Sequence, residues 1–392
     1  MANLFRANKK GSAVNLISIT ITTQPTKRDY ARNDVLDLTG IVVTGLLSNG
    51  NTADITSLCT FSPANGSTLS TGGVKNVTAE YAGLTATTTI TVFSSISVTT
   101  APTKYVYAPN DNLNLTGLKI TGTAGSTTKD VTSDCTSSPI DGTPLTTIGM
   151  NEITVSYLGL STKFYVNVTS SALENYTWSQ IRTMLVNGTL GSTVSVGATK
   201  TIKLSSNEII ELQLASINDG TGTASSYYPN HTADFVSVGV MDSGHRMNST
   251  NTNVGGWNDS QMRTYLNETV YPTLPSDLRA VIVEKTHMRT EGNQSSTLVS
   301  ASDKLWLPTH FEIGGSGQGE SSSYNIKYSI FTDNASRKKY RKSAPTNAQV
   351  WWLSSPYIST SGHFTMIISD GSPGSGDGAS YSHAVVLCLR IG

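Results

Sequence analysis

Side chains that could bind a ligand gather in one stretch near the C-terminus. Between the block Trp351–Pro356 and the apolar run Ala384–Ile391, small, polar and aromatic residues are interleaved. Tyrosine offers a large contact area at low entropic cost, serine offers adaptable hydrogen bonds, and loops on a rigid scaffold often carry binding sites. We therefore expect a ligand-binding face here, with a merely solvated loop as the alternative. The candidate residues are Tyr357, Ser359, Ser361, His363, Ser380, Tyr381 and His383.

Two carboxylates in the same stretch are weak candidates for a calcium site. Asp370 and Asp377 flank a run of glycine, serine and proline. Calcium takes about six to eight oxygen ligands, which two carboxylates and backbone carbonyls could supply, although a solvated turn is the simpler interpretation. The histidines are dispersed without metal-ligand spacing, so we predict no other metal and no cofactor.

Residue patterns typical of catalysis are missing from the sequence. It contains no Gly-x-Ser-x-Gly elbow, no His-Glu-x-x-His helix and no P-loop. A glycosidase needs two carboxylates across a cleft, and no spacing selects such a pair. We predict that the chain is not an enzyme, with a cell-wall polysaccharide hydrolase kept as an alternative. Its carboxylates would come from Glu208, Glu211, Asp259, Glu268 and Glu312.

Composition and charge limit the kinds of partner that the chain is expected to bind. The 392 residues include 27 Lys and Arg against 27 Asp and Glu, so the formal net charge is zero, and only 14% of residues are charged. A neutral chain argues against nucleic-acid binding, which needs a basic surface. No apolar run approaches the ~20 residues of a membrane span, so we expect no membrane insertion.

The N-terminus and the cysteines bear on the cellular compartment. Arg6, Lys9 and Lys10 make the first residues basic, but no apolar segment follows, so we expect no secretory signal. The three cysteines, Cys59, Cys135 and Cys388, are scattered and odd in number. This pattern predicts free, buried thiols rather than a disulfide framework or a zinc site.

An internal repeat determines the number of domains. Residues 25–40 and 102–117 share Pro-Thr-Lys, a tyrosine, Asn-Asp and Leu-Thr-Gly, with Tyr30 matching Tyr107 at an offset of 77 residues. Further along, Cys59 matches Cys135 at an offset of 76 residues. Apolar and polar residues alternate in each copy, which predicts short strands packed as a sandwich. With Ile-Thr-x-x-Cys closing the pattern in the first copy and Val-Thr-x-x-Cys in the second, both copies resemble bacterial immunoglobulin-like domains.

The remainder of the chain has a different character, because all five tryptophans follow residue 170. The spacing predicts a helix over 176–187 capped by Thr177, a second helix capped by Asn258, and a Gly-rich loop over 369–382. We expect the tryptophans to pack in the core. His245, which lies beside Asp242 and Arg246, is expected to make a structural hydrogen bond.

Four ordered blocks carry a resemblance in this region. They are His245–Asn248, Gly255–Asn267, Leu305–Pro308 and Trp351–Pro356. In this order they resemble C-terminal domains of phage and Gram-positive surface proteins, which have a C-type-lectin-like fold related to the formylglycine-generating enzymes. Ser354 departs from the family, which usually has arginine there. The cysteines that those enzymes use are also missing, since Cys388 stands alone in an apolar strand.

These observations predict a mainly β chain with two immunoglobulin-like sandwiches and an α+β C-type-lectin-like domain. The expected boundaries are an attachment segment at 1–14, modules at 15–94 and 95–170, and the C-terminal domain at 171–392. We expect a bacteriophage virion-surface protein, made in the host cytoplasm, whose C-terminal domain adheres to a host glycan or surface protein. The first segment would attach it to other virion proteins. A decoration protein without a specific ligand is the alternative. Such proteins are often homo-oligomers, but no heptad repeat indicates the stoichiometry.

Overall fold

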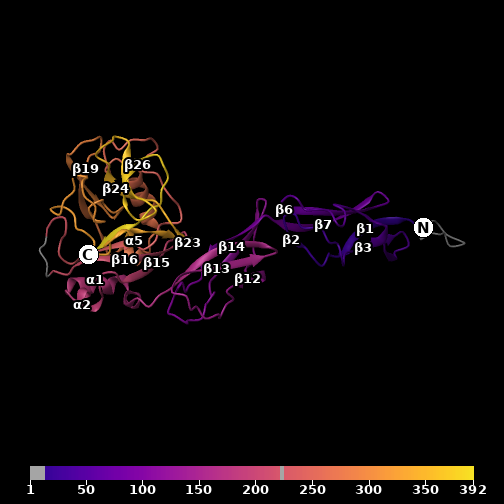
Figure 1. Cartoon of the computed structure of the whole chain (residues 1–392). Coiled ribbons are helices and arrows are strands. Elements are labelled where there is room, and N and C mark those ends of the chain that lie inside the picture. Colours follow the sequence, from indigo (N-terminus) through magenta and orange to yellow (C-terminus); the bar gives the residue numbers. More distant parts are fainter. Residues whose placement is uncertain (1–13, 221–224) are drawn as a thin grey trace. The chain divides into compact units, whose positions relative to one another are not determined.

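A computed structural model describes residues 14–220 and 225–392 of the chain (Figure 1). These residues form two compact units, one built mainly from the two repeat copies and the other mainly from the residues after Tyr165. All but Val14 of the predicted attachment segment lies outside the described residues.

The first repeat copy is a sandwich of two sheets whose strands are mainly antiparallel. One sheet has the order β1-β3-β4, and the other has the order β2-β7-β6-β5, in which β2 runs parallel to β7. The strands are β1 (Leu16–Thr23), β2 (Asp29–Ala31), β3 (Val42–Leu47), β4 (Thr52–Asp54), β5 (Thr60–Ser62), β6 (Gly73–Tyr81) and β7 (Leu84–Phe93), with a 3-10 turn η1 (Thr56–Leu58) before β5.

The second copy repeats this topology strand for strand. Its sheets have the orders β8-β10-β11 and β12-β13-β14-β9, and β9 again runs parallel to β14. The elements are β8 (Ser95–Thr100), β9 (Val106–Tyr107), β10 (Lys119–Ala124), β11 (Thr127–Asp130), η2 (Thr132–Asp134), β12 (Thr136–Ser138), β13 (Gly149–Tyr157) and β14 (Leu160–Val168).

The residues that revealed the repeat have equivalent places in the two copies. Tyr30 and Tyr107 are both buried, and the Tyr30 hydroxyl donates a hydrogen bond to the Asp37 carbonyl (2.8 Å). Cys59 and Cys135 each follow the 3-10 turn. Both thiols are free, as predicted, but they are partly exposed rather than buried, because they flank a surface turn; Cys388 is fully buried.

The C-terminal domain mixes helices and strands. Its helical elements are η3 (Ala172–Asn175), α1 (Trp178–Val186), α2 (Leu190–Thr193), α3 (Gln261–Thr264), a π-helical turn η4 (Tyr265–Val270), η5 (Tyr271–Thr273), α4 (Ser276–Arg279) and α5 (Asn334–Arg337). Its strands are β15 (Thr199–Lys203), β16 (Ile209–Asn218), β17 (Thr232–Ser237), β18 (Ile282–Val283), β19 (Lys285–Thr290), β20 (Leu298–Asp303), β21 (Leu305–Trp306), β22 (Tyr340–Arg341), β23 (Ala344–Ala348), β24 (Trp351–Pro356), β25 (His363–Ile367), β26 (Pro373–Gly378) and β27 (Cys388–Ile391).

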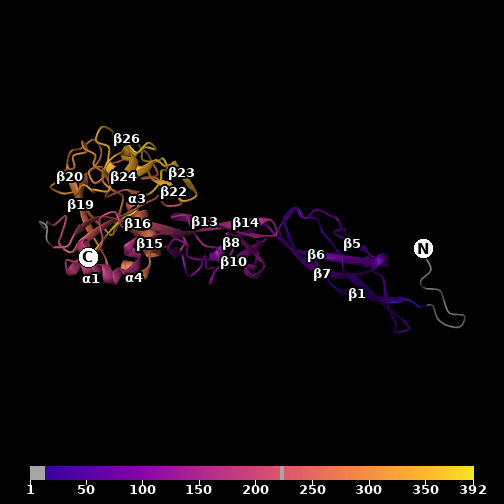
Figure 2. The same cartoon turned by 60° about the horizontal axis from the view of Figure 1, so that its bottom comes forward.

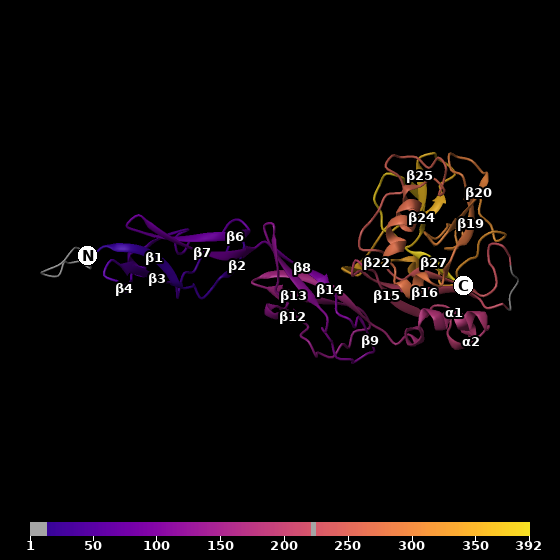
Figure 3. The ribbon, with the colours of Figure 1, turned by 180° about the vertical axis from the view of Figure 1, so that it is seen from behind.

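One six-stranded sheet organises this domain. Its order is β15-β16-β17-β27-β18, with β21 also paired to β27, so the last strand of the chain lies inside the sheet. Helices α1 and α4 contact each other beside β15 and β16 (Figures 2 and 3). The Trp178 ring of α1 packs edge-on against Phe235 of β17, with ring centroids 5.3 Å apart. A separate three-stranded sheet, β24-β25-β26, contains His363, and the other C-terminal candidate residues lie in the segments that follow β24 and β26.

The helix beginning at residue 178 forms as predicted. The Thr177 hydroxyl accepts a hydrogen bond from the Gln180 amide (3.2 Å), the Gln180 side chain accepts one from the Thr177 amide, and Gly188 follows with a positive φ of 68°. This reciprocal pairing is a capping box. The tryptophans of the four blocks are buried, as expected.

Two local predictions are wrong. The helix over 261–264 is capped by Ser260 rather than Asn258: the Ser260 hydroxyl accepts from the Arg263 backbone amide (3.2 Å), and the Asn258 side-chain amide donates to the Ser300 carbonyl (3.0 Å). The Gly-rich stretch 369–382 contains strand β26, which pairs with β25 and approaches it closely: a Cβ on Gly376 would lie 2.9 Å from the Phe364 carbonyl. No helix within 14–220 or 225–392 has the length and apolar character needed to cross a membrane.

Candidate functional site

The structure brings the predicted ligand-binding residues onto one surface, formed by residues 357–363 and 378–383 and called here the 357–383 face. Residues 357–362 connect β24 to β25, and residues 379–383 follow β26. The Ala379 amide donates to the Gly362 carbonyl (2.9 Å), so the two segments are joined directly. Tyr357 lies next to Gly376 of β26, where a Cβ would approach the tyrosine Cβ to 3.0 Å.

A buried asparagine holds the first of these segments. The Asn253 side-chain amide donates to the carbonyls of His363 (2.7 Å), Thr360 (2.8 Å) and Tyr357 (3.4 Å). Its side-chain oxygen accepts from the Asn293 amide (2.8 Å), and its backbone amide donates to the Ser361 carbonyl (2.7 Å). Because Asn253 is fully buried, these bonds are shielded from water.

Asn251 holds the second segment in the same way. Its side-chain oxygen accepts from the Ser380 amide (3.0 Å) and the Ser380 hydroxyl (2.6 Å). The Gln294 amide adds a bond to the Ser359 carbonyl (3.1 Å). The loop that contains Asn251 and Asn253 thus positions both halves of the face.

The candidate residues divide into supporting and exposed members. The Ser380 hydroxyl is taken by Asn251, and the His383 ring lies 2.8 Å from the Asp377 carboxylate and edge-on to Trp352, with ring centroids 4.6 Å apart. Tyr357 and His363 are half-buried, whereas Ser359 and Ser361 are exposed. Tyr381 is the largest exposed side chain of the face, at 57%.

The two calcium candidates are not brought together. Asp370 lies in the turn before β26, where its carboxylate accepts from the Ser372 amide (2.7 Å) and hydroxyl (2.6 Å). Asp377 lies near the other end of the same extended strand, beside His383. The Ser372 bonds hold the pKa of Asp370 below its ordinary value. Within the described ranges no three His, Cys, Asp or Glu side chains gather as metal ligands.

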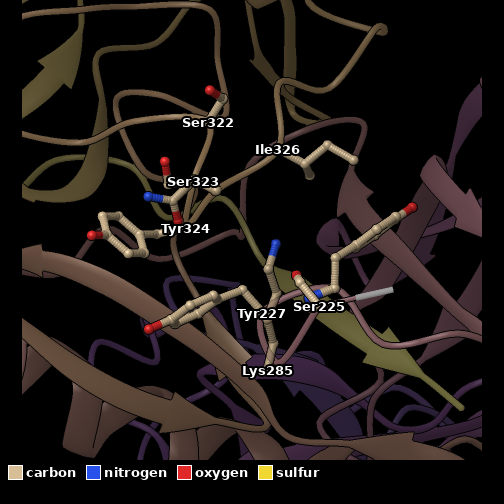
Figure 4. A pocket seen from close by; sticks show the side chains of 9 residues that line it. Ser225, Tyr227, Lys285, Ser322, Ser323, Tyr324 and Ile326 are labelled. Atoms are coloured by element: carbon tan, nitrogen blue, oxygen red, sulfur yellow. The ribbon is translucent and has the colours of Figure 1, made fainter. Parts of the chain in front are cut away.

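A second group of residues, which sequence reasoning missed, surrounds a small cavity of about 260 Å³ (Figure 4). Two Ser-Ser-Tyr segments, at 225–227 and 322–324, line it from loops nearly a hundred residues apart. The Tyr227 and Tyr324 rings meet edge to face, with centroids 5.4 Å apart. The repeated Ser-Ser-Tyr triplet is the one sequence signal that could have indicated this pocket.

A buried ion network lies beneath this pocket. The Lys285 ammonium donates to Asp234 (2.9 Å), Glu312 (2.5 Å) and the Tyr328 hydroxyl (2.8 Å). Arg390 donates to both oxygens of Asp234 (2.6 and 3.0 Å). All five side chains are at most 2% exposed, and the two cations balance the two anions.

The network fixes the charges of its carboxyl groups. Burial by itself would raise the pKa of Asp234, but the Arg390 and Lys285 charges outweigh it and hold the pKa below its ordinary value. Lys285 likewise lowers the pKa of Glu312 against the effect of burial. Glu312, a carboxylate of the hydrolase alternative, is therefore an ion-paired core residue.

Two further positions that the sequence singles out, His245 and Ser354, make hydrogen bonds in the structure. The His245 ring makes a hydrogen-bond contact with the Arg246 carbonyl (2.7 Å) and stacks on Tyr265, with centroids 4.1 Å apart, so its contacts are structural. At Ser354, the position named above as a departure from the resemblance, the hydroxyl accepts a hydrogen bond from the Arg289 side chain of β19 (2.8 Å).

Comparison with protein families gives two matches. Residues 230–390 match the family described as "Domain of unknown function (DUF6273)", and residues 23–92 match the family described as "Bacterial Ig-like domain (group 3)". The first match begins just before β17, so β15 and β16 lie outside it although they complete the sheet. No curated protein matches the sequence. The N-terminal part of the chain therefore contains a bacterial immunoglobulin-like domain, as the repeat predicted.

Proposed function

We propose that the chain is an adhesion protein, in which immunoglobulin-like modules carry a C-terminal domain that binds a carbohydrate or protein on a bacterial cell surface. The observation that carries the proposal is the gathering of Ser359, Ser361 and Tyr381 as exposed side chains on one surface held by Asn251 and Asn253. A preorganised surface loses little entropy when it binds.

The composition of the face supports binding rather than catalysis. Tyrosine and serine are the residue types that dominate antibody-like binding surfaces. The carboxylate of Asp377, which directly precedes the second segment of the face, lies 2.8 Å from the His383 ring. We assign the contact surface for the ligand to Tyr357, Ser359, Ser361, His363 and Tyr381.

The same proposal includes the fold and the location of the C-terminal domain. We propose that it is a C-type-lectin-like domain displayed on a bacteriophage virion. Its support is the ordered set of blocks, whose tryptophans Trp257, Trp306, Trp351 and Trp352 all lie in the core as a fold-defining set would. Antibody labelling of particles released from a lysed culture, viewed by electron microscopy, tests this setting and separates head from tail. Particles that bind no antibody would overturn it.

Binding of the fluorescently labelled full chain to bacterial cells tests the adhesion itself. The variant Tyr381→Ala should bind at least about tenfold more weakly, which corresponds to about 1.4 kcal/mol. The matched control is Ile140→Ala in the second module, where the isoleucine is 67% exposed and its loss should change nothing. Periodate treatment of the cells removes binding if the ligand is a glycan, and protease treatment removes it if the ligand is a protein.

Two results would replace the proposal with an alternative. Full chain that binds no tested cell would favour a decoration protein without a ligand. Release of reducing sugar from cell walls would favour a hydrolase.

A further inference from the structure

The pocket between the two Ser-Ser-Tyr segments has its own structural support. The 225–228 turn is closed by the Ser225 amide donating to the Tyr228 carbonyl and the Tyr228 amide to the Ser225 carbonyl (both 3.1 Å). The Asn218 side chain donates to the Tyr228 carbonyl (3.1 Å). Arg390 of the buried network donates to the Tyr227 carbonyl (3.0 Å) and lies over the Tyr228 ring. This wall is therefore tied to the core of the domain.

The other lining segment, residues 322–326, is also held by hydrogen bonds. The amides of Tyr324 and Asn325 both donate to the Ser321 carbonyl (3.2 and 3.1 Å). The Asn325 side-chain amide donates to the Met288 carbonyl of β19 (3.2 Å). Asn325 is 7% exposed, and among the described residues its side-chain oxygen has no hydrogen-bond partner. Asn325 therefore ties this segment of the pocket lining to β19.

The charge of the pocket limits the chemical class of ligand that it can bind. Of the lining residues that the structure describes, Lys285 is the one with a charged side chain, and Figure 4 shows that side chain pointing towards the middle of the pocket. Its ammonium already contacts Asp234 and Glu312, so the floor presents no net positive charge to an anion. The other lining residues are uncharged: three tyrosines, three serines, one asparagine and one isoleucine.

We propose that this pocket binds one neutral sugar unit of a glycan. Faces of tyrosine rings pack against the C–H surfaces of a sugar ring, while serine hydroxyls donate hydrogen bonds to its hydroxyls and accept hydrogen bonds from them. The cavity of about 260 Å³ is below the usual range for drug-sized ligands and accommodates a single small ring. The site is built from segments other than the 357–383 face and stands independently of the adhesion assigned to that face.

The test uses the full chain and the methyl glycosides of glucose, galactose, rhamnose and N-acetylglucosamine. Saturation-transfer NMR detects binding, and calorimetry measures the Kd. At least one glycoside should bind, and Tyr227→Ala and Tyr324→Ala should each weaken it at least about tenfold. Tyr324→Phe, which keeps the ring, should bind nearly as well as the original chain. Both tyrosines are partly exposed, so the variants should fold.

The control separates this proposal from the adhesion function. Tyr381→Ala removes an aromatic ring from the 357–383 face and should leave glycoside binding unchanged. The proposal is overturned if no glycoside binds at millimolar concentration, if Tyr227→Ala and Tyr324→Ala bind as well as the original chain, or if inorganic phosphate binds in the pocket and the sugars do not. None of these results would alter the effect of Tyr381→Ala on cell binding.

Discussion

Replacing Asn253 by alanine tests how the 357–383 face is held. The change removes two donated bonds, to His363 (2.7 Å) and Thr360 (2.8 Å), a longer contact with the Tyr357 carbonyl (3.4 Å), and one bond accepted from Asn293 (2.8 Å). A net hydrogen bond contributes about 0.5–1.5 kcal/mol, and the longest bond contributes least. We therefore expect the free energy of unfolding of the C-terminal domain to fall by about 2–4 kcal/mol.

The effect should also be local. Hydrogen exchange measured by mass spectrometry should show faster exchange in peptides covering 357–363, while β15 to β17 keep their protection. The matched control is Asn347→Ala, because Asn347 is exposed on the β22–β23 hairpin and should change neither quantity. A loss of stability below about 1 kcal/mol, with unchanged exchange in 357–363, would refute the claim that Asn253 holds the face.

Three further predictions concern the scaffold. Asp234→Asn leaves Lys285 and Arg390 buried without their full partner, so urea denaturation should show a loss of about 3–5 kcal/mol; a loss below 1 kcal/mol would contradict the network's role. Burial raises the pKa of Glu320 to about 7 from an ordinary 4.5, so this carboxyl group contributes stability that falls as pH rises from 4.5 to about 7, while His287 and His310, whose pKa values burial lowers to about 3 and about 4, contribute the opposite slope. The stability of the original chain relative to Glu320→Gln should therefore fall over this pH range, with Glu320→Gln the more stable form at pH 8, and a difference that does not change with pH would argue against it. Thr177→Ala removes the capping box of α1 and should lower stability by about 1 kcal/mol in thermal denaturation, whereas an unchanged melting temperature would show that the cap is dispensable.

The immunoglobulin-like modules were predictable because their signals are local. Alternation of apolar and polar residues marks each strand, and the repeat of Tyr30 as Tyr107 and of Cys59 as Cys135 identifies equivalent places. The two copies have the same strand order as a consequence. The cap of α1 was predictable for the same reason, since Thr177 and Gln180 are three residues apart.

The support of the candidate face was not predictable, since it depends on partners far apart in the chain. Asn253 meets the carbonyls of residues more than a hundred positions later, and Asp234 pairs with Arg390 across 156 residues. No periodicity links such positions. Asn258 shows the converse: its type suits a helix cap, but a long-range bond to Ser300 uses its side chain. Tertiary competition of this kind lies beyond a single sequence.

Glycine in the C-terminal sheet misled the sequence reasoning for a physical reason. A run of glycines is usually a loop, because glycine gives up the most backbone freedom on folding. In β26 the glycines are required by close neighbours, since a Cβ on Gly378 would lie 2.6 Å from the Asn251 side-chain oxygen. The strand therefore brings residues 378–383 against the loop that also holds 357–363.

Hydrogen exchange of the full chain, with and without intact cell envelopes to which it binds, tests the adhesion function most directly. Peptides covering 357–363 and 378–383 should exchange more slowly in the bound state, and this protection should be absent in Tyr381→Ala. Protection confined to β1 through β14, with no change in either segment of the face, would contradict the assignment of binding to the C-terminal domain.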